Sequence, residues 1–148
     1  MSRLEEMIKK GRIKKAEISE EMIQKEFSIA GRDLDSAQKS IEDGNYKWAT
    51  VQAYYAIFHA IRALLYKAGY REESHAALKV ALKEIYIMPG LLPEHVYQVL
   101  ERGMDLREMA DYKDSFSKNG AEILYTGVAE SLKYVKEILS EVTSENVN

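Results

Sequence analysis

Hydrophobic positions recur every three or four residues along most of the chain, which is the period of an α-helix. From Ile23 to Ile41 the apolar residues follow steps of 4, 3, 4, 3 and 4 and form one seam. Further helices are expected from Ser74 to Met88, from Pro93 to about Ser115 and from about Ala121 to Glu141. Val, Ile and Thr are scattered rather than alternating. The pattern predicts an all-α, up-and-down antiparallel bundle of about five helices.

The stretch from Tyr46 to Gly69 is predicted to be the central helix, and three kinds of side chain share its surface. Small residues form one stripe: Ala49, Ala53, Ala56, Ala60 and Ala63. Bulky apolar residues fill much of the rest. A third stripe carries polar groups: Gln52, Tyr55, His59, Arg62 and Tyr66. A helix that is apolar nearly all round is normally buried, and its polar groups must then find partners. The third stripe is therefore either a satisfied core network or the wall of a cleft.

Caps and charge divide the chain into three parts. Residues 1–18 form a charged arm, with a basic cluster around Gly11 and a short helix from about Arg3 to Lys10. The arm is either solvated and partly mobile or contacts RNA phosphates or an acidic partner surface. Residues 19–141 form the bundle, which begins after Ser19 as an N-cap. Residues 142–148 are expected to be a frayed tail.

The composition excludes several classes of site and surface but does not identify a function. The 148 residues are 46% apolar and 30% charged, as in a single soluble domain. A net charge of −3 argues against a surface that is basic overall. The absence of cysteine excludes disulfides, thiolate metal sites and cysteine nucleophiles. No apolar run approaches the ~20 residues of a membrane helix. We expect a cytoplasmic protein that has no membrane partner.

Arginine and histidine residues supply candidate chemistry for RNA. Cleavage of RNA without a metal needs a base for the 2′-hydroxyl and a cation for the phosphorane charge. Arg107 and Arg62 provide cations that bind phosphate well. His59 or His75 provides a base that titrates near neutrality. Arg107 and Asp111 are four residues apart and share one helix face. Neither a H-E-x-x-H pattern nor a P-loop is present, so we expect no metal and no cofactor.

The same residues allow a structural interpretation. Arg62 or Arg107 paired with Asp111, and hydrogen-bonded to Tyr55 and Tyr112, would make a satisfied polar network or a device for dimer specificity. A homodimer through the central hairpin is expected because one small bundle leaves some apolar faces of the central helix uncovered.

Three blocks then suggest a family. AYYAIFHAIRALL spans 53–65, ESH spans 73–75 and LREMADYKD spans 106–114. Together they resemble the HEPN domain, in particular the small stand-alone HEPN proteins of prokaryotes. The resemblance covers roughly residues 19–139. It implies a helical bundle, commonly dimeric. Many such proteins are ribonucleases of toxin–antitoxin and defence systems, and others pair with a minimal nucleotidyltransferase and bind nucleotides or nucleic acid.

Arg107 matches the arginine of the family's ribonuclease motif, and Glu108 is the polar residue that follows it. The motif histidine is missing: this chain has Tyr112, Lys113 and Asp114 where it is expected. Tyrosine, with an ordinary pKa of about 10, is a poor general base at neutral pH. The resemblance therefore favours a protein without efficient catalysis.

We expect a HEPN protein that binds nucleotide or RNA and acts with a minimal nucleotidyltransferase in a toxin–antitoxin-like module. A metal-independent endoribonuclease toxin and a structural helical adaptor are the alternatives. The catalytic candidates are Arg107 and His59. The expected ligand-binding residues are Tyr55, Arg62, His75, Asp111 and Tyr112.

Overall fold

A computed structural model describes residues 1–141, and the predicted tail 142–148 lies outside the described residues. Residues 1–141 form six α-helices, one π-helical turn and two short strands. In order they are α1 (Arg3–Lys9), β1 (Ile13–Lys15), α2 (Glu20–Glu42), α3 (Tyr46–Lys67), β2 (Tyr70–Glu72), α4 (His75–Leu82), the π-helical turn η1 (Lys83–Ile87), α5 (Glu94–Lys113) and α6 (Lys118–Ser140).

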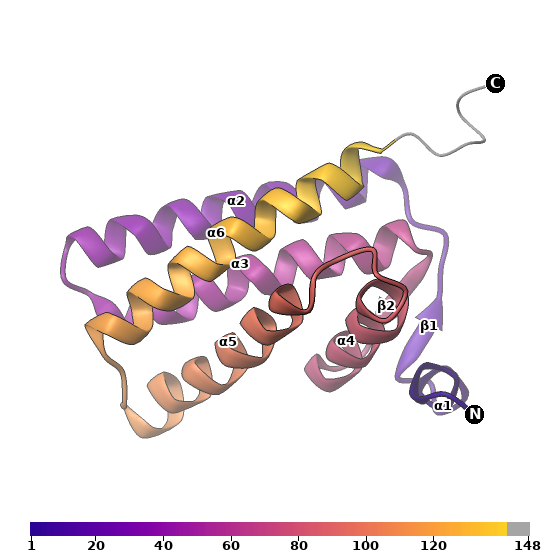
Figure 1. Ribbon diagram of the computed structural model, residues 1–148, viewed down its shortest axis with the longest axis horizontal. Coiled ribbons are helices and arrows are strands. Elements are labelled where there is room, and N and C mark those ends of the chain that lie inside the picture. The colour runs from indigo at the N-terminus through magenta and orange to yellow at the C-terminus, as the bar shows by residue number, and fades with distance from the viewer. Residues whose placement is uncertain (142–148) are drawn as a thin grey trace.

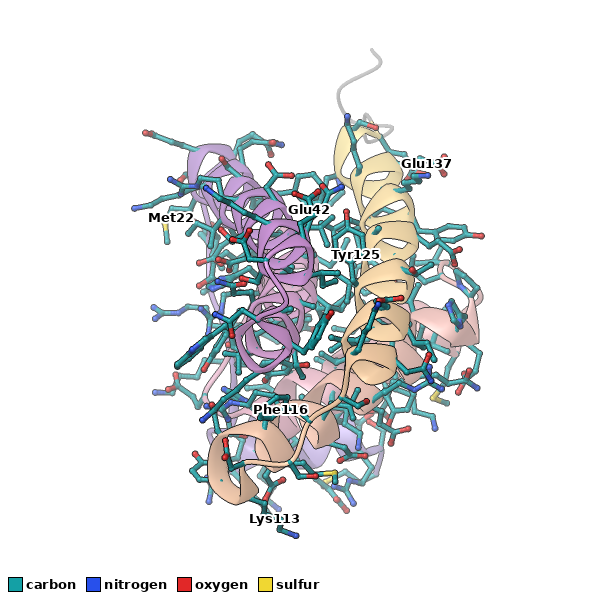
Figure 2. All side chains as sticks on the ribbon, turned by 90° about the vertical axis from the view of Figure 1, so that its left-hand side faces the viewer. Met22, Glu42, Lys113, Phe116, Tyr125 and Glu137 are labelled. Carbon is teal, nitrogen blue, oxygen red and sulfur yellow. The ribbon has the colours of Figure 1, made fainter. Side chains whose placement is uncertain are left out.

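The four long helices form the predicted antiparallel bundle around α3 (Figure 1). Helices α2, α5 and α6 all contact α3, and α4 closes its remaining side. Figure 2 shows α2 and α6 running side by side, with Tyr125 of α6 on the side that faces α2. The fold class is therefore as the helical periodicity predicts.

Helix α3 is buried within a single chain. All five alanines of its small stripe are fully buried, which lets neighbouring helices approach closely. The bulky residues Ile57, Ile61 and Leu65 are also fully buried. Because α2, α4, α5 and α6 cover these faces, the apolar character of α3 gives no support to the expected dimer.

Helix boundaries follow the cap residues. The Ser19 hydroxyl accepts a hydrogen bond from the Met22 amide, and Ser74 caps α4 through the Ala77 amide. Gly69 follows the last residues of α3 and has a φ of +88°. This left-handed conformation, which glycine tolerates, ends the helix. The predicted start of the last helix at Ala121 is wrong. The Ser117 hydroxyl caps α6 by accepting a hydrogen bond from the Gly120 amide. The helix therefore starts at Lys118, and residues 118–120 belong to its first turn.

The prediction that the chain is all-helical misses one small sheet. Strand β1, in the charged N-terminal segment, pairs antiparallel with β2, which lies between α3 and α4. Ile13 faces Glu72 in this pairing, and its side chain is fully buried. Strands of three residues are too short to show an alternating pattern, so only the long-range pairing reveals them. Helix α1 confirms the short helix predicted near residues 3–10.

Candidate functional site

The polar stripe of α3 contacts two separate groups of charged side chains. One group, the Arg107 cluster, consists of Tyr54, Tyr55, His75, Arg107 and Asp111. The other, the Glu26 network, consists of Glu26, His59, Arg62 and Glu72. At one end the polar stripe contacts Arg107 through Tyr55, and farther along it His59 and Arg62 belong to a satisfied network.

Arg107 of α5 lies against α3, with aromatic rings around its guanidinium group. Its Nη2 donates a hydrogen bond to the Tyr55 hydroxyl at 3.1 Å. The guanidinium carbon lies 5.7 Å from the ring centres of Tyr55 and Tyr112 and 5.8 Å from that of Tyr54. These are distances at which an aromatic face attracts a cation. The aromatic faces attract the guanidinium charge without using its N–H donors.

The donors of Arg107 are mostly unused. Asp111 Oδ2 lies 3.0 Å from Nε, but the geometry does not make a hydrogen bond, and the buried Nε has no such partner among the described residues. We treat this contact as an ion pair because the distance is short while the alignment is poor. A guanidinium group has five N–H donors, and within residues 1–141 Arg107 makes one hydrogen bond, to Tyr55. Arg107 therefore has capacity left for an oxyanion.

A cavity of about 210 Å³ opens beside this guanidinium group. Side chains from three helices line it: Tyr54, His75, Met104, Arg107, Glu108 and Tyr112. Tyr112 is 72% exposed, so it borders the mouth of the cavity. The size suits a phosphate and part of its sugar better than a complete nucleotide, since pockets for whole small molecules usually exceed ~300 Å³.

His75, the first residue of α4, shares this cavity. Its Nδ1 lies 2.6 Å from the hydroxyl of the buried Tyr54, whose pKa is raised by burial. No other acceptor for that hydroxyl exists among the described residues, so the phenol donates to Nδ1. Burial first, and then the positive charges of Arg107 and Arg62, lower the pKa of His75. The imidazole is therefore neutral at pH 7 with its proton on Nε2, where it is a hydrogen-bond donor.

The Glu26 network ties α2, α3 and β2 together. Arg62 Nε and Nη2 donate to Glu72 Oε2 at 2.9 and 2.7 Å, and Arg62 Nη1 lies 3.8 Å from Glu26. His59 Nδ1 donates to Glu26 Oε2 at 2.6 Å. The Glu72 side chain is only 4% exposed. Each charge here faces an opposite one, so the network has little capacity for a ligand.

The structure separates the two predicted catalytic residues. His75, and not His59, lines the cavity with Arg107. Asp111 lies beside Arg107 as the four-residue spacing predicts. The Tyr112 ring also lies near the guanidinium group, and Tyr55 contacts it from α3. Arg62 lies in the Glu26 network together with His59. His59 is one helical turn from Tyr55, with ring centres 6.4 Å apart.

Sequence reasoning missed three residues of these groups: Tyr54, Glu26 and Glu72. Tyr54 falls in the bulky stripe of α3, where a tyrosine looks like ordinary core. Glu26 lies outside the apolar seam of its helix, and Glu72 lies in the short segment between two predicted helices. The signal that could have found them is the surplus of charge on α3. His59 and Arg62 on a buried helix require carboxylates from neighbouring segments.

Residues 1–141 hold no cluster of three or more His, Cys, Asp or Glu side chains placed to bind a metal ion. Within the same residues, no helix combines the length and apolar character that a membrane span requires.

Comparisons with known proteins agree with this architecture. A Methanocaldococcus jannaschii protein named "Putative toxin MJ0605" is 29% identical over 123 residues, covering 82% of this chain and 92% of that protein. An Archaeoglobus fulgidus protein named "UPF0332 protein" is 34% identical over 79 residues, covering 53% of this chain and 62% of that protein. Residues 23–146 match the HEPN domain as a family. Because this match extends over most of the sequence, the chain belongs to the HEPN domain family.

Proposed function

We propose that this HEPN protein binds a phosphate of RNA or of a nucleotide in the Arg107 cavity, without efficient catalysis. One observation carries the proposal: a charged arginine with most of its donors unused lies beside an open cavity. Arg107 would hold two phosphate oxygens, and His75 Nε2–H would donate to a third atom of the ligand. A histidine in this tautomer binds an anion but takes no proton from a 2′-hydroxyl.

The relative named as a toxin supports placing the chain in a toxin–antitoxin-like module. A minimal nucleotidyltransferase partner is part of the proposal, and it rests on what the family resemblance implies. A pull-down would test that part by itself: the tagged chain should retain an untagged minimal nucleotidyltransferase from the same organism.

A metal-independent endoribonuclease is the second candidate. The hydrogen bond between His59 and Glu26 favours it. Because a carboxylate only accepts, His59 Nδ1 carries the proton in its bond to Glu26. A neutral His59 then has an unprotonated Nε2, the form required of a general base.

One experiment separates binding from cleavage. The wild-type protein, an Arg107→Ala variant and an Arg102→Ala control are mixed with a labelled RNA dodecamer in EDTA. Arg102 is an exposed arginine on the same helix. Binding without cleavage, weakened by about 10- to 100-fold only in Arg107→Ala, is the expected result, since a hydrogen bond to a charged group contributes about 1.5–3 kcal/mol.

Cleavage that Arg107→Ala abolishes would replace the first candidate with the second. Equal binding by all three proteins would place RNA binding away from Arg107 and contradict the proposed site. Neither binding nor cleavage by any of them would contradict both candidates and leave a structural adaptor.

A further inference from the structure

Three hollows of the surface meet at the first turn of α4. His75 lines the Arg107 cavity, Ser74 and Ala76 line a second hollow, and Ala76 also lines a larger groove along the outer face of α4. We propose that a single-stranded RNA follows this path, from the Arg107 cavity across the start of α4 into the groove. The inference rests on the proposed function, because it extends the same site.

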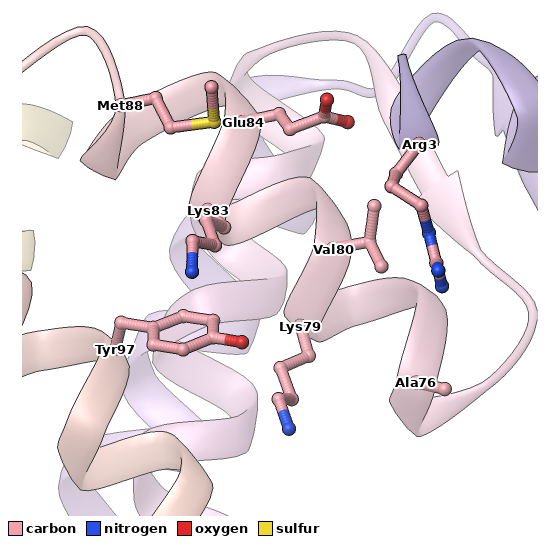
Figure 3. Close-up of a pocket in the computed structure, with 8 residues that line it drawn as sticks. All are labelled: Arg3, Ala76, Lys79, Val80, Lys83, Glu84, Met88 and Tyr97. Carbon is pink, nitrogen blue, oxygen red and sulfur yellow. The ribbon is translucent and has the colours of Figure 1, made fainter. Parts of the chain in front are cut away.

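The groove has a volume of about 570 Å³ and lies between α1, α4 and α5 (Figure 3). Val80 forms part of its floor, Arg3 borders it from α1, and Tyr97 borders it from α5. Lys83 Nζ lies 4.8 Å from the centre of the Tyr97 ring. Figure 3 shows Lys79 and Lys83 on the same side of α4 as Tyr97. The groove thus combines an apolar floor, an aromatic side chain and cations.

The π-helical turn η1 shapes the far end of this groove. Its wide turn is closed by a hydrogen bond from the Met88 amide to the Lys83 carbonyl, five residues back. In a regular α-helix Ile87 would follow Lys83 on the groove face, four residues on. The extra residue turns Ile87 into the core and places Met88 at the groove instead. Such π-helical segments are frequent at functional sites.

On the proposed path, the strand crosses the second hollow between the Arg107 cavity and the groove. Lys10 and Arg12, from the segment between α1 and β1, line it together with Ser74 and Ala76. Pairing of β1 with β2 fixes this basic segment next to α4: the Glu73 amide donates to the Arg12 carbonyl at 2.8 Å. The basic part of the arm, for which the sequence left a mobile and a ligand-binding role open, is therefore held beside the first turn of α4.

Charge along the path is complementary to a polyanion. Within residues 1–141, no ion pair engages Arg3, Lys10, Arg12 or Lys83. Two carboxylates near the groove have partners, since Glu101 lies 2.8 Å from Lys79 Nζ and Glu84 accepts the Leu4 amide, while Glu108 lines the Arg107 cavity. This excess of cations contrasts with the net charge of −3 for the whole chain.

A nucleic acid strand is the occupant these features fit. Proteins that bind single strands combine a basic groove that follows the backbone with aromatic side chains on which bases stack. Helix α4 has 8 residues and is about 12 Å long, which corresponds to roughly three phosphates at the spacing of a helical strand. An apolar peptide would leave the cations along this path without partners.

The test compares a long and a short probe. The probes are a fluorescent 2′-O-methyl oligouridine of twelve nucleotides, which cannot be cleaved through its 2′-oxygen, and the corresponding dinucleotide. The test variant combines Lys10→Gln, Arg12→Gln and Lys83→Gln. The control combines Lys25→Gln, Lys133→Gln and Lys136→Gln, which are also exposed lysines. Affinity is measured by anisotropy at several salt concentrations.

We expect the test variant to lose about 100-fold in dodecamer affinity at 0.1 M salt, with a salt slope shallower by about 2, since each phosphate contact contributes about 0.7. Its dinucleotide affinity and the dodecamer affinity of the control should not change. An unchanged dodecamer affinity, or an equal loss in the control, would overturn the path. A wild-type protein that binds the dodecamer but not the dinucleotide would instead refute the Arg107 cavity as the primary site.

Discussion

The Arg107 cluster and the Glu26 network are built from the same kinds of residue, yet they differ in how many partners those residues have. Each contains an arginine, a histidine and a carboxylate, and both adjoin the polar stripe of α3. Arg62 is held by Glu72 and Glu26 and also lies 4.5 Å from the ring centre of Phe58. In the part of the chain that the structure describes, Arg107 makes a single hydrogen bond, and it faces a cavity.

The comparison teaches that residue type and helical spacing alone do not identify a binding site. A buried charge with matched partners ties elements together, and removing one partner is costly. A charge with unused donors beside open space can take a ligand without losing existing bonds. We therefore assign stability to the Glu26 network and ligand binding to the Arg107 cluster. Three predictions, each with a control, test this assignment.

Glu72→Gln should cause the largest loss of stability. It removes the charge that faces Arg62 at a site where the Glu72 side chain is 4% exposed. Because Arg62 is partly exposed, we expect a loss of about 2 kcal/mol, below the range for a fully buried pair. Urea unfolding measures this loss, and dinucleotide affinity should remain at the wild-type value.

Glu73→Gln is the matched control for that change. It breaks only an exposed bridge to Lys14 at 3.5 Å and should cost less than about 0.5 kcal/mol. Equal losses in the two variants would show that the Glu26 network has no special structural role.

Tyr54→Phe should have a smaller effect on stability and a specific one on His75. Losing the buried hydroxyl removes one hydrogen bond, which contributes about 1 kcal/mol. His75 Nδ1 is then free to carry the proton, and nitrogen NMR of the imidazole should report a mixture of tautomers. Tyr86→Phe removes a similar buried hydroxyl, which donates to the Leu64 carbonyl at 2.6 Å, and should leave the His75 spectrum unchanged. A single unchanged tautomer in Tyr54→Phe would contradict the donor role of His75.

The pH dependence of His75 should be the smallest effect. Burial, followed by Arg107 and Arg62, lowers its pKa from the ordinary 6.5, so the unfolded chain binds this proton more readily than the folded one. Stability from this group is therefore present above pH 6.5 and is lost as the pH falls from 6.5 toward the folded pKa. Proton NMR titration should give a pKa below 6.5, and the wild-type protein should lose more stability than His75→Asn on acidification. A pKa above 6.5 would contradict the sign.

The sequence by itself determined the helices, their caps and the faces they bury. Leu124, Val128, Leu132, Val135 and Leu139 are buried along α6 as their spacing predicts. The arginine at position 107 with its neighbour Asp111 was equally predictable, because residues four apart on a helix must meet. These features are local, so the period and the cap residues suffice to predict them.

Only the tertiary structure decided which polar residues meet across elements. Tyr54 and His75 are 21 positions apart, and Glu26 and His59 are 33 apart. Pairing of β1 with β2 likewise joins segments more than fifty residues apart and brings the basic arm to α4. Such contacts depend on how helices rotate and pack against one another, and no residue period records that packing. For that reason the sequence predicted the chemical groups of the site, while the fold decided that His75 lies beside Arg107 and that His59 pairs with Glu26.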